Sequence, residues 1–257
     1  MSRVAPEDRT GPSELPGAVF FDMDDTIFDH ALTCRRALAL LRRDKGFLRM
    51  RSLDEVWHEY SRLLEAVHAD VLAGRVSVQA ARTERFRLLA EFSGSGITSG
   101  AAAELSRQYR EHYQLVRRTV PGIRRVLERF HGRTVVGIVT NNQVAEQEEK
   151  LDHFGLRPLI DFMVVSEGVG FAKPDRRIFE LALERAGTAA GDAVMIGDSW
   201  TSDVAGSRSV GIRPIWFNRF HLARPDPWPV LELDSYRAPA RVEAAVAGHP
   251  ATNSLPL

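Results

Sequence analysis

The chain has 257 residues, which is enough to bury a full core as one large domain or as one domain with an insertion. Its 34 basic and 34 acidic side chains cancel, so no overall basic field draws it to a nucleic-acid polymer or to a membrane surface. The single cysteine, Cys34, excludes an internal disulfide and a thiolate zinc cluster. The sequence has no apolar leader and no run near ~18 apolar residues, so we expect a soluble cytoplasmic protein.

The first strand predicted from the sequence ends in a group of acids. Residues 1–17 mix charge with proline, and we expect a flexible N-terminal segment there. Residues 18–21 form a continuous apolar run, which is typical of a strand buried on both faces of a parallel sheet. Asp22, Asp24 and Asp25 follow directly, and because like charges raise one another's pKa, a cation is expected beside them. An Asp-x-Asp pair by itself also fits a helix cap or a turn.

Helical patterns without any strand signal fill residues 31–116. A roughly ninety-residue helical block is far longer than an ordinary strand-to-helix connection of ~2–6 residues, so we expect an inserted all-helical domain. Cys34 within it is interpreted as a small buried hydrophobe. Apolar residues recur there at three- and four-residue steps, as in amphipathic helices with one apolar stripe: Leu38, Leu41, Trp57, Tyr60, Leu64, Val67 and Val71.

From residue 121 onward, helical and strand patterns alternate. Such alternation indicates right-handed βαβ units, and therefore an α/β fold with a doubly wound parallel sheet covered by helices on both faces. We assign residues 18–30 and 117–235 to this core domain and residues 236–257 to a C-terminal tail with a short helix near 238–249. The expected strands are 134–140, 160–167, 193–198 and 213–218, and the expected helices are 121–132, 143–155, 173–187 and 201–211.

Polar residues follow two of these strands. Thr140 and Asn141 end the strand at 134–140, and Lys173 lies at a helix start after the next strand. In a doubly wound sheet, such positions share one crevice beyond the carboxyl ends of the strands. A hydroxyl, backbone N–H groups and an ammonium bind phosphoryl oxygens, so these three residues are candidate phosphate-binding residues.

Carboxylates gather at the same predicted crevice. Asp198 ends the strand at 193–198, and Asp203 lies one helical turn later. Together with Asp22 and Asp24, Asp198 supplies the hard oxygen ligands that Mg²⁺ prefers, and the metal would relieve their repulsion. Each strand-end group alone also fits a cap or a turn, but four in order, each at the end of a predicted strand, favour one shared site.

Four short motifs in this chain resemble those of the haloacid dehalogenase superfamily. They are DMDDT at 22–26, VTNN at 139–142, KPD at 173–175 and GDSWTSD at 197–203. The helical insertion after the first motif resembles the cap domain of the subclass that carries its cap at that position. The resemblance covers about residues 18 to 220, and the motifs are specific in combination.

The resemblance implies a role for each motif residue. Asp22 is similar to the nucleophile that forms an aspartyl-phosphate, and Asp24 to the general acid that protonates the leaving alkoxide and later activates water. Thr140 and Lys173 resemble the phosphoryl binders, and Asp198 the metal ligand. The remaining implied contributors are the backbone carbonyl of Asp24 as a further metal ligand, Asp203 as the acid that orients the metal and the lysine, and Thr26 and Ser199 as supporting residues.

The same resemblance implies a substrate class. Family phosphatases carry an acid at the position of Asp24 and dehalogenases lack it, so we expect Mg²⁺-dependent hydrolysis of a small phosphate monoester. The stretch 72–89 resembles caps of nucleoside-monophosphate phosphatases and N-acylneuraminate-9-phosphatases, which favours a nucleoside monophosphate or a sugar phosphate. Within it, the spacing of Arg82, Arg85 and Phe86 is more typical of packing and solvated-face residues than of substrate contacts.

Other functions share some of these features. A phosphosugar mutase of the β-phosphoglucomutase kind has all four motifs, and a 2-haloacid dehalogenase has the fold. A non-catalytic relative should lack at least one motif residue, and a phospho-acceptor receiver domain is about half this length without a helical insertion. The physiological substrate and the oligomeric state stay open at the level of sequence.

Overall fold

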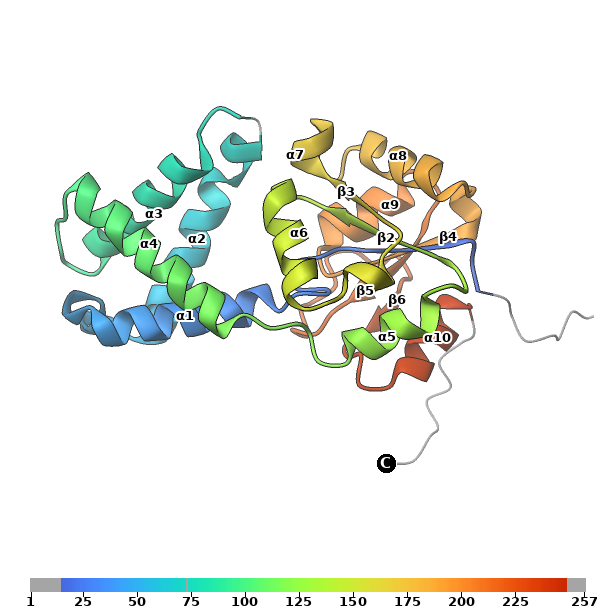
Figure 1. The fold of residues 1–257 in the computed structure, drawn as a ribbon, viewed down its shortest axis with the longest axis horizontal. Coiled ribbons are helices and arrows are strands. Elements are labelled where there is room, and N and C mark those ends of the chain that lie inside the picture. The colour runs from blue at the N-terminus through green and yellow to red at the C-terminus, as the bar shows by residue number, and fades with distance from the viewer. Residues whose placement is uncertain (1–14, 73, 249–257) are drawn as a thin grey trace, which may run out of the picture.

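The structure, a computed structural model, describes residues 15–72 and 74–248. Within these residues, six parallel strands form one sheet in the order β3-β2-β1-β4-β5-β6, so the chain winds outward from β1 in both directions (Figure 1). The predicted α/β fold with a doubly wound parallel sheet is confirmed. The strands are β1 (Ala18–Phe21), β2 (Val135–Thr140), β3 (Phe162–Val165), β4 (Ala193–Gly197), β5 (Arg213–Phe217) and β6 (Leu231–Leu233).

Helices cover both faces of this sheet, because the side chains of a pleated strand point alternately to its two sides. Val19 and Phe21 of β1 lie in a hydrophobic cluster that includes residues of α5 and α10. Ala18 and Phe20 lie in a second cluster with residues of α8. The helices of this part are α5 (Ile123–Phe130), α6 (Val144–His153), α7 (Ser166–Val169), α8 (Arg176–Ala186), α9 (Gly206–Arg208) and α10 (Pro239–Val246).

Several helix boundaries differ from the sequence prediction, and two of them lie close to the predicted site residues. The helix expected over 173–187 begins later because the Asp175 side chain caps its first turn, so Lys173 precedes the helix. The helix expected over 201–211 begins as a π-helical turn, Trp200–Ala205, which continues into α9. π-helical turns occur frequently at functional sites, and this one directly follows β4.

The C-terminal part of the chain packs into the core. Strand β6, which the sequence pattern did not predict, pairs in parallel with β5. Residues 236–248, which the sequence placed in a tail, bury Tyr236, Val242 and Val246, and the ring of Tyr236 stacks on Phe217 at 4.1 Å between centroids. Residues 249–257 of the expected tail and residues 1–14 of the expected flexible segment lie outside the described residues. None of the described helices is long and apolar enough to cross a membrane.

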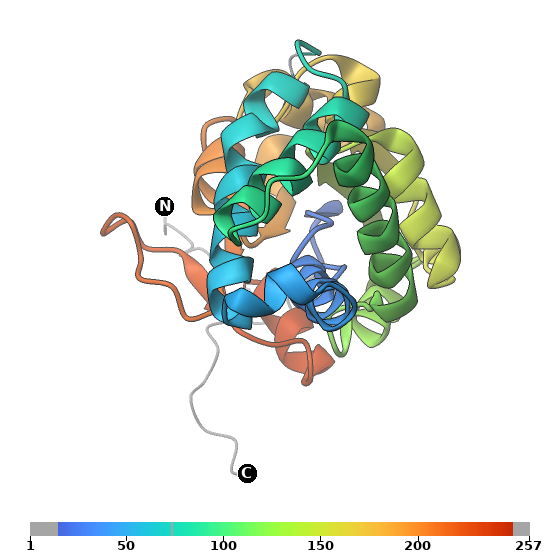
Figure 2. The same ribbon diagram turned by 90° about the vertical axis from the view of Figure 1, so that its left-hand side faces the viewer.

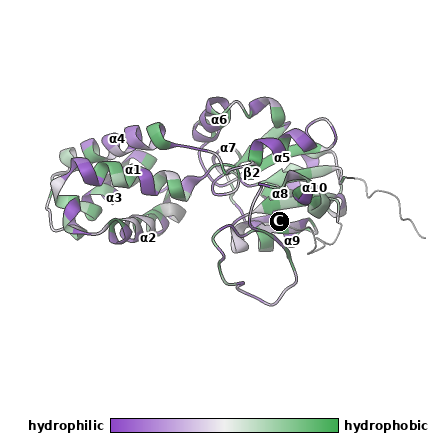
Figure 3. Cartoon of the chain, turned by 90° about the horizontal axis from the view of Figure 1, so that it is seen from below, coloured by the Kyte–Doolittle hydropathy of each residue, from purple (hydrophilic) through white to green (hydrophobic). Residues whose placement is uncertain are grey.

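Four long helices form the inserted part of the chain. Each mixes hydrophobic and hydrophilic residues along its length, as Figure 3 shows. The helices lie together at one end of the molecule in Figure 1, and Figure 2 shows them from that end. Their apolar side chains form a hydrophobic cluster of their own, in which Cys34 is buried as expected. The separate cluster supports our proposal that residues 31–116 form a cap domain. The helices are α1 (His30–Asp44), α2 (Leu53–Leu72), α3 (Val78–Phe92) and α4 (Ser99–Val116).

Two adjacent connections join the helical part to the sheet. Phe28 forms a β-bridge with Thr119, and the backbone N–H of Asp29 donates to the carbonyl of Arg118 at 3.0 Å. Ion pairs also join the helical part to the core, because Glu146 of α6 binds arginines from α3 and α4. The helical part therefore lies beside the carboxyl ends of the strands, where the sequence motifs converge (Figure 1).

Candidate active site

The turn after β1 separates the first two acids of the opening motif. The backbone N–H of Asp22 donates to the carbonyl of Ile196 at 2.9 Å, so Asp22 still belongs to the sheet edge. Two residues later the chain reverses, with the N–H of Phe28 bonded to the carbonyl of Met23 at 2.8 Å and Asp25 at a φ of 61°. Aspartate tolerates this left-handed conformation better than most side chains. The tight turn directs Asp22 and Asp24 to different neighbours.

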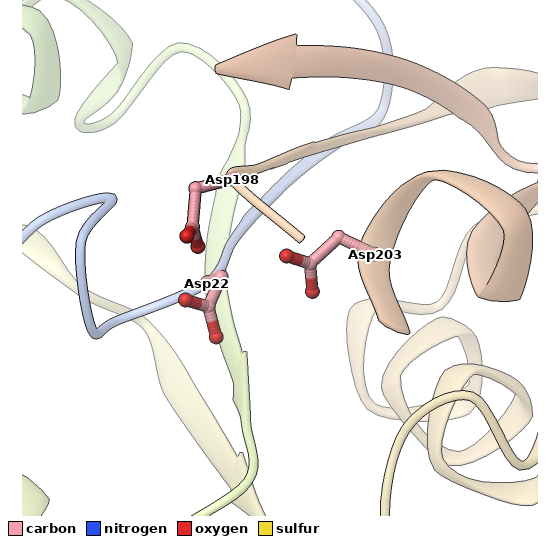
Figure 4. A group of neighbouring side chains, drawn as sticks. All are labelled: Asp22, Asp198 and Asp203. Carbon is pink, nitrogen blue, oxygen red and sulfur yellow. The ribbon is translucent and has the colours of Figure 1, made fainter. Parts of the chain in front are cut away.

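Three carboxylates meet at the ends of β1 and β4. Oxygens of Asp22, Asp198 and Asp203 all lie within 4.8 Å of one another, and Figure 4 shows the three groups facing a common space. Burial raises the pKa of Asp22 to about 7, with the nearby Asp203 adding to the effect and Lys173 opposing it. Burial also raises the pKa of Asp198 well above its usual range, and its two carboxylate neighbours contribute.

Lys173 places a positive charge beside two of these carboxylates, and the sequence predicted a cation beside the acids that follow the first strand. Its ammonium lies 2.5 Å from Oδ1 of Asp22 and 2.6 Å from Oδ1 of Asp203. Burial lowers the pKa of Lys173, but the two carboxylates outweigh burial and raise it above the ordinary value. Asn141 positions the backbone of this lysine, because its side-chain amide donates to the Lys173 carbonyl at 2.9 Å and accepts from the Lys173 N–H at 2.7 Å.

The Asp24 side chain is not part of the three-carboxylate cluster and has its own donors. Lys150 lies 2.5 Å from Oδ1, and the amides of Gln147 and Asn142 donate to Oδ2 at 3.0 and 2.9 Å. Burial opposes the charge on Asp24, but Lys150 and His30 outweigh it and hold the pKa of Asp24 below its usual range. The second acid of the motif is therefore a stabilised carboxylate in this structure.

Sequence reasoning did not single out Asn142, Gln147 or Lys150. Gln147 and Lys150 lie three residues apart on α6 and share one face of that helix. In the sequence, two polar residues at this spacing indicate a solvated face, yet Gln147 is 0% exposed and Lys150 is 5% exposed. Asn142 ends the VTNN motif, and its position beside Thr140 was the one available signal.

The donor set at the cluster fits a divalent cation. Asp198 receives only a 3.4 Å contact from the Thr26 hydroxyl among the described residues, so its oxygens have free lone pairs. Asp203 is more fully engaged, since its Oδ2 accepts from the Ser199 N–H at 2.9 Å while Oδ1 binds the lysine. Three carboxylates facing one ammonium leave excess negative charge, and hard oxygen donors of this kind suit Mg²⁺. The Asp24 side chain is not part of the cluster, so only its backbone carbonyl is a candidate ligand.

The remaining predicted residues surround this cluster. Thr140 is 1% exposed, and its hydroxyl accepts from the Gln147 amide at 3.1 Å, which leaves the hydroxyl hydrogen to donate. Thr26 is fully buried beneath Asp198. The Ser199 hydroxyl caps the π-helical turn by accepting from the N–H of Ser202 at 3.2 Å. All of the predicted site residues thus lie at the carboxyl edge of the sheet.

Gly197 allows the close approach of Asp203 to the end of β4. A Cβ atom at position 197 would lie 2.3 Å from the carboxyl carbon of Asp203, well inside van der Waals contact. We expect Gly197→Ala to displace Asp203 from Lys173 and to reduce turnover at least tenfold. Overpacking should lower the free energy of unfolding by about 1–3 kcal/mol, and the melting temperature should fall with it. Calorimetry and steady-state kinetics measure both effects. Gly191→Ala, where a Cβ meets no neighbour, is the control and should change neither.

A cavity of about 690 Å³ connects this edge of the sheet with the helical part. Asp24, Asn141 and Asn142 line it from the sheet side, and α2, α3 and α4 supply its opposite wall. The wall contains aliphatic side chains, three tyrosines and Arg85. A small molecule in this space would contact the Asp24 carboxylate and the helical part at once.

The family model described as haloacid dehalogenase-like hydrolase matches residues 16–211. The pyrimidine 5'-nucleotidase YjjG of Escherichia coli is 38% identical over 119 residues, which are 44% of this chain and 53% of that protein, so the match spans about half of that relative. The phosphoserine phosphatase of Thermus thermophilus is 29% identical over 247 residues, which are 88% of this chain and 98% of that protein.

Solved structures have the same fold. The putative HAD-hydrolase YfnB from Bacillus subtilis, bound to magnesium, superimposes with a TM-score of 0.71 at 24% identity, covering 90% of this chain and 99% of that one. A 2-haloacid dehalogenase from Pseudomonas syringae gives a TM-score of 0.60 at 26% identity, covering 90% of this chain and 99% of that one.

Proposed function

The chain belongs to the haloacid dehalogenase-like hydrolase family, and from this premise we propose that it is a Mg²⁺-dependent phosphatase acting on a small phosphate monoester. The observation that supports the proposal most is the arrangement at the end of β1. Asp22 is held 2.5 Å from a buried lysine beside two further carboxylates, and Asp24 faces the adjoining cavity. This arrangement has a nucleophile, a charge-neutralising cation and a second carboxylate for proton transfer.

In the first step, an oxygen of Asp22 attacks phosphorus in line with the ester bond. The ester P–O bond breaks, and the leaving alkoxide takes a proton from Asp24. Lys173 and the hydroxyl of Thr140 bind the phosphoryl oxygens, which lowers the repulsion between an anionic nucleophile and an anionic ester. A Mg²⁺ held by Asp22, Asp198 and the Asp24 carbonyl would neutralise further charge on the phosphoryl group.

In the second step, water attacks the aspartyl-phosphate. Asp24 accepts the proton of that water, Asp22 is regenerated, and inorganic phosphate leaves. Lys150 and the two amides favour the ionised form of Asp24, which is the form that acts as a base. The protonated form used in the first step requires the Lys150 contact to loosen when substrate binds.

The proposed substrate class is a nucleoside monophosphate or a sugar phosphate. The named activities of similar proteins support a small phosphate ester, since they include pyrimidine 5'-nucleotidase, phosphoserine phosphatase and glyceraldehyde 3-phosphate phosphatase. The cavity has room for a substrate of several carbon atoms beyond its phosphate. The carboxylate at position 24 favours a phosphatase over a dehalogenase, which has no leaving-group oxygen to protonate.

The lifetime of the phosphoenzyme separates a phosphatase from a phosphosugar mutase. In a phosphatase, water reaches the aspartyl-phosphate, so we expect the intermediate to decay rapidly whether or not an acceptor is present. Single-turnover quench experiments with ³²P-labelled substrate, with and without added hexose phosphate, measure this decay. Slow decay that a hexose phosphate accelerates would assign the protein to the mutases.

A further inference from the structure

Arg85 is a buried cation without a counter-charge. Its side chain lies on α3 and lines the cavity, and the residue is 8% exposed. Its Nη1 donates to the Tyr60 hydroxyl at 3.3 Å, and its guanidinium carbon lies 5.3 Å from the centroid of that ring. Its Nε is buried and has no hydrogen-bond partner, and no carboxylate of the described residues pairs with it.

Packing alone does not account for an arginine here. A buried charge carries a desolvation cost that a leucine or methionine of similar volume would avoid, and arginine in protein interiors is normally paired with an acid. The Tyr60 ring and hydroxyl offset part of that cost, but they leave the positive charge and the Nε donor unsatisfied. A ligand that brings negative charge into the cavity would neutralise the positive charge of the guanidinium.

The carboxylates that line the cavity are otherwise engaged. Asp24 is paired with Lys150 at 2.5 Å, and Glu146 binds Arg110 at 2.9 Å. Arg82 also pairs with Glu146. Glu167 is exposed at the rim, where it accepts from the N–H of Val144 at 2.9 Å. The wall of the cavity around Arg85 therefore has positive charge that no described protein group neutralises.

The cavity has polar groups on both of its sides and apolar side chains elsewhere in its lining. Asp24, Asn141 and Asn142 lie at the edge where the phosphoryl group would be bound, and Arg85 lies on the wall that the helical part supplies. The lining also includes the apolar residues Leu64, Val67, Val71, Val78 and Ala81. A molecule with two anionic groups and carbon atoms between them could contact both sides of the cavity.

We propose that the substrate carries a second oxyanion, a carboxylate or a second phosphate, and that Arg85 binds it. The proposal rests on the proposed phosphatase function and narrows its substrate class to acidic sugar phosphates and sugar bisphosphates. The guanidinium has a planar fork of donors that matches two oxyanion oxygens, so it both binds and orients the far end of the substrate. Arg85 is thus a specificity residue on the cavity wall that the helical part supplies.

Matched substrate pairs test this proposal. 6-Phosphogluconate and sorbitol 6-phosphate differ only in a terminal carboxylate against a hydroxymethyl group, and fructose 1,6-bisphosphate and fructose 6-phosphate differ in one phosphate. We expect at least one acidic member to have a kcat/KM roughly tenfold to a hundredfold above its partner, as for a hydrogen bond between charged groups. Which pair shows the larger ratio identifies the second anion as a carboxylate or a phosphate.

Substitution of Arg85 should remove this preference. In Arg85→Gln we expect kcat/KM for the preferred acidic substrate to fall roughly tenfold to a hundredfold, mainly through KM, while its partner changes less than about threefold. Arg85→Lys keeps the charge and should retain part of the preference. Arg87→Gln is the matched control, because Arg87 lies on the same helix but pairs with Glu84 and Glu91 and does not line the cavity.

A binding measurement separates this proposal from the proposed function. Isothermal titration of the preferred pair into Asp22→Asn protein should show the same affinity ratio, and Arg85→Gln in that background should abolish it. Discrimination in binding without any turnover by the wild type would retain the anion site and overturn the phosphatase. Two results would overturn the anion site. One is turnover of phosphate esters by the wild type without preference for either acidic member. The other is a loss of kcat/KM for uridine monophosphate in Arg85→Gln that equals the loss for the acidic substrate.

Discussion

Asp22→Asn is expected to reduce Mg²⁺-dependent hydrolysis of p-nitrophenyl phosphate by about a thousandfold or more. An amide lacks the anionic oxygen that attacks phosphorus, and no other described carboxylate lies in the same position at the end of β1. The variant should also fail to form an acid-stable, hydroxylamine-sensitive phosphoenzyme when it is quenched after mixing with labelled substrate. Hydrolysis above a trace at an unchanged circular dichroism spectrum would contradict the assignment of the nucleophile.

The same substitution should leave the fold intact. Burial raises the pKa of Asp22 to about 7, so in metal-free protein its ionisation costs stability as the pH rises from the unfolded value near 3.8 through about 7. Asparagine removes that cost, and Lys173 keeps its contact with Asp203 at 2.6 Å. In EDTA, the melting temperature of Asp22→Asn minus that of the wild type should therefore increase as the pH rises from 3.8 to about 7, and it should stay constant at higher pH.

Asp25→Asn is the matched control for this experiment. It makes the same chemical change three residues along the chain, at a φ of 61° that asparagine also tolerates. Its side-chain oxygen can still accept from the N–H of Ala31, a bond of 2.9 Å in the structure. The control should keep most of the wild-type turnover, whereas a loss equal to that of Asp22→Asn would mean that the loop, and not the nucleophile, is responsible.

Removal of the metal is expected to have an effect of similar size. EDTA should abolish turnover and excess Mg²⁺ should restore it, because without a cation the carboxylates of Asp22, Asp198 and Asp203 repel an anionic ester. Ca²⁺ should replace Mg²⁺ poorly, since its larger and looser coordination shell misplaces the attacking and leaving oxygens. Equal rates with and without the chelator would assign another role to the carboxylates.

A stability measurement tests the metal site without any substrate. A cation that binds only the folded state raises the melting temperature by mass action. Mg²⁺ should therefore stabilise the wild type, and Asp198→Asn should lose most of this stabilisation because Asp198 has the least engaged oxygens of the cluster. If Mg²⁺ raised the melting temperature of that variant as much as that of the wild type, the cation would bind elsewhere.

Local patterns in the sequence determined the fold class and the position of the candidate site. The apolar run at residues 18–21 predicted the central strand, because a strand buried on both faces cannot alternate with polar residues. The alternation after residue 121 predicted the parallel sheet, and in such a sheet the carboxyl ends of the strands share one edge. The sequence therefore predicted that four side chains lie close together, those of Asp22, Lys173, Asp198 and Asp203.

Only the tertiary structure decided which side chains surround those residues. Lys150 binds Asp24 across 126 positions of the chain, and whether a helical lysine faces solvent or a distant carboxylate depends on how that helix packs. The sequence left Arg85 between packing and a solvated face, and the structure buries it beside a cavity that forms only when α2, α3 and α4 lie beside the sheet. The burial of Tyr236 likewise depends on a partner, Phe217, from another segment. Periodicity records which face of an element is apolar, but burial and pairing of a polar group depend on its neighbours from distant segments, which no local pattern contains.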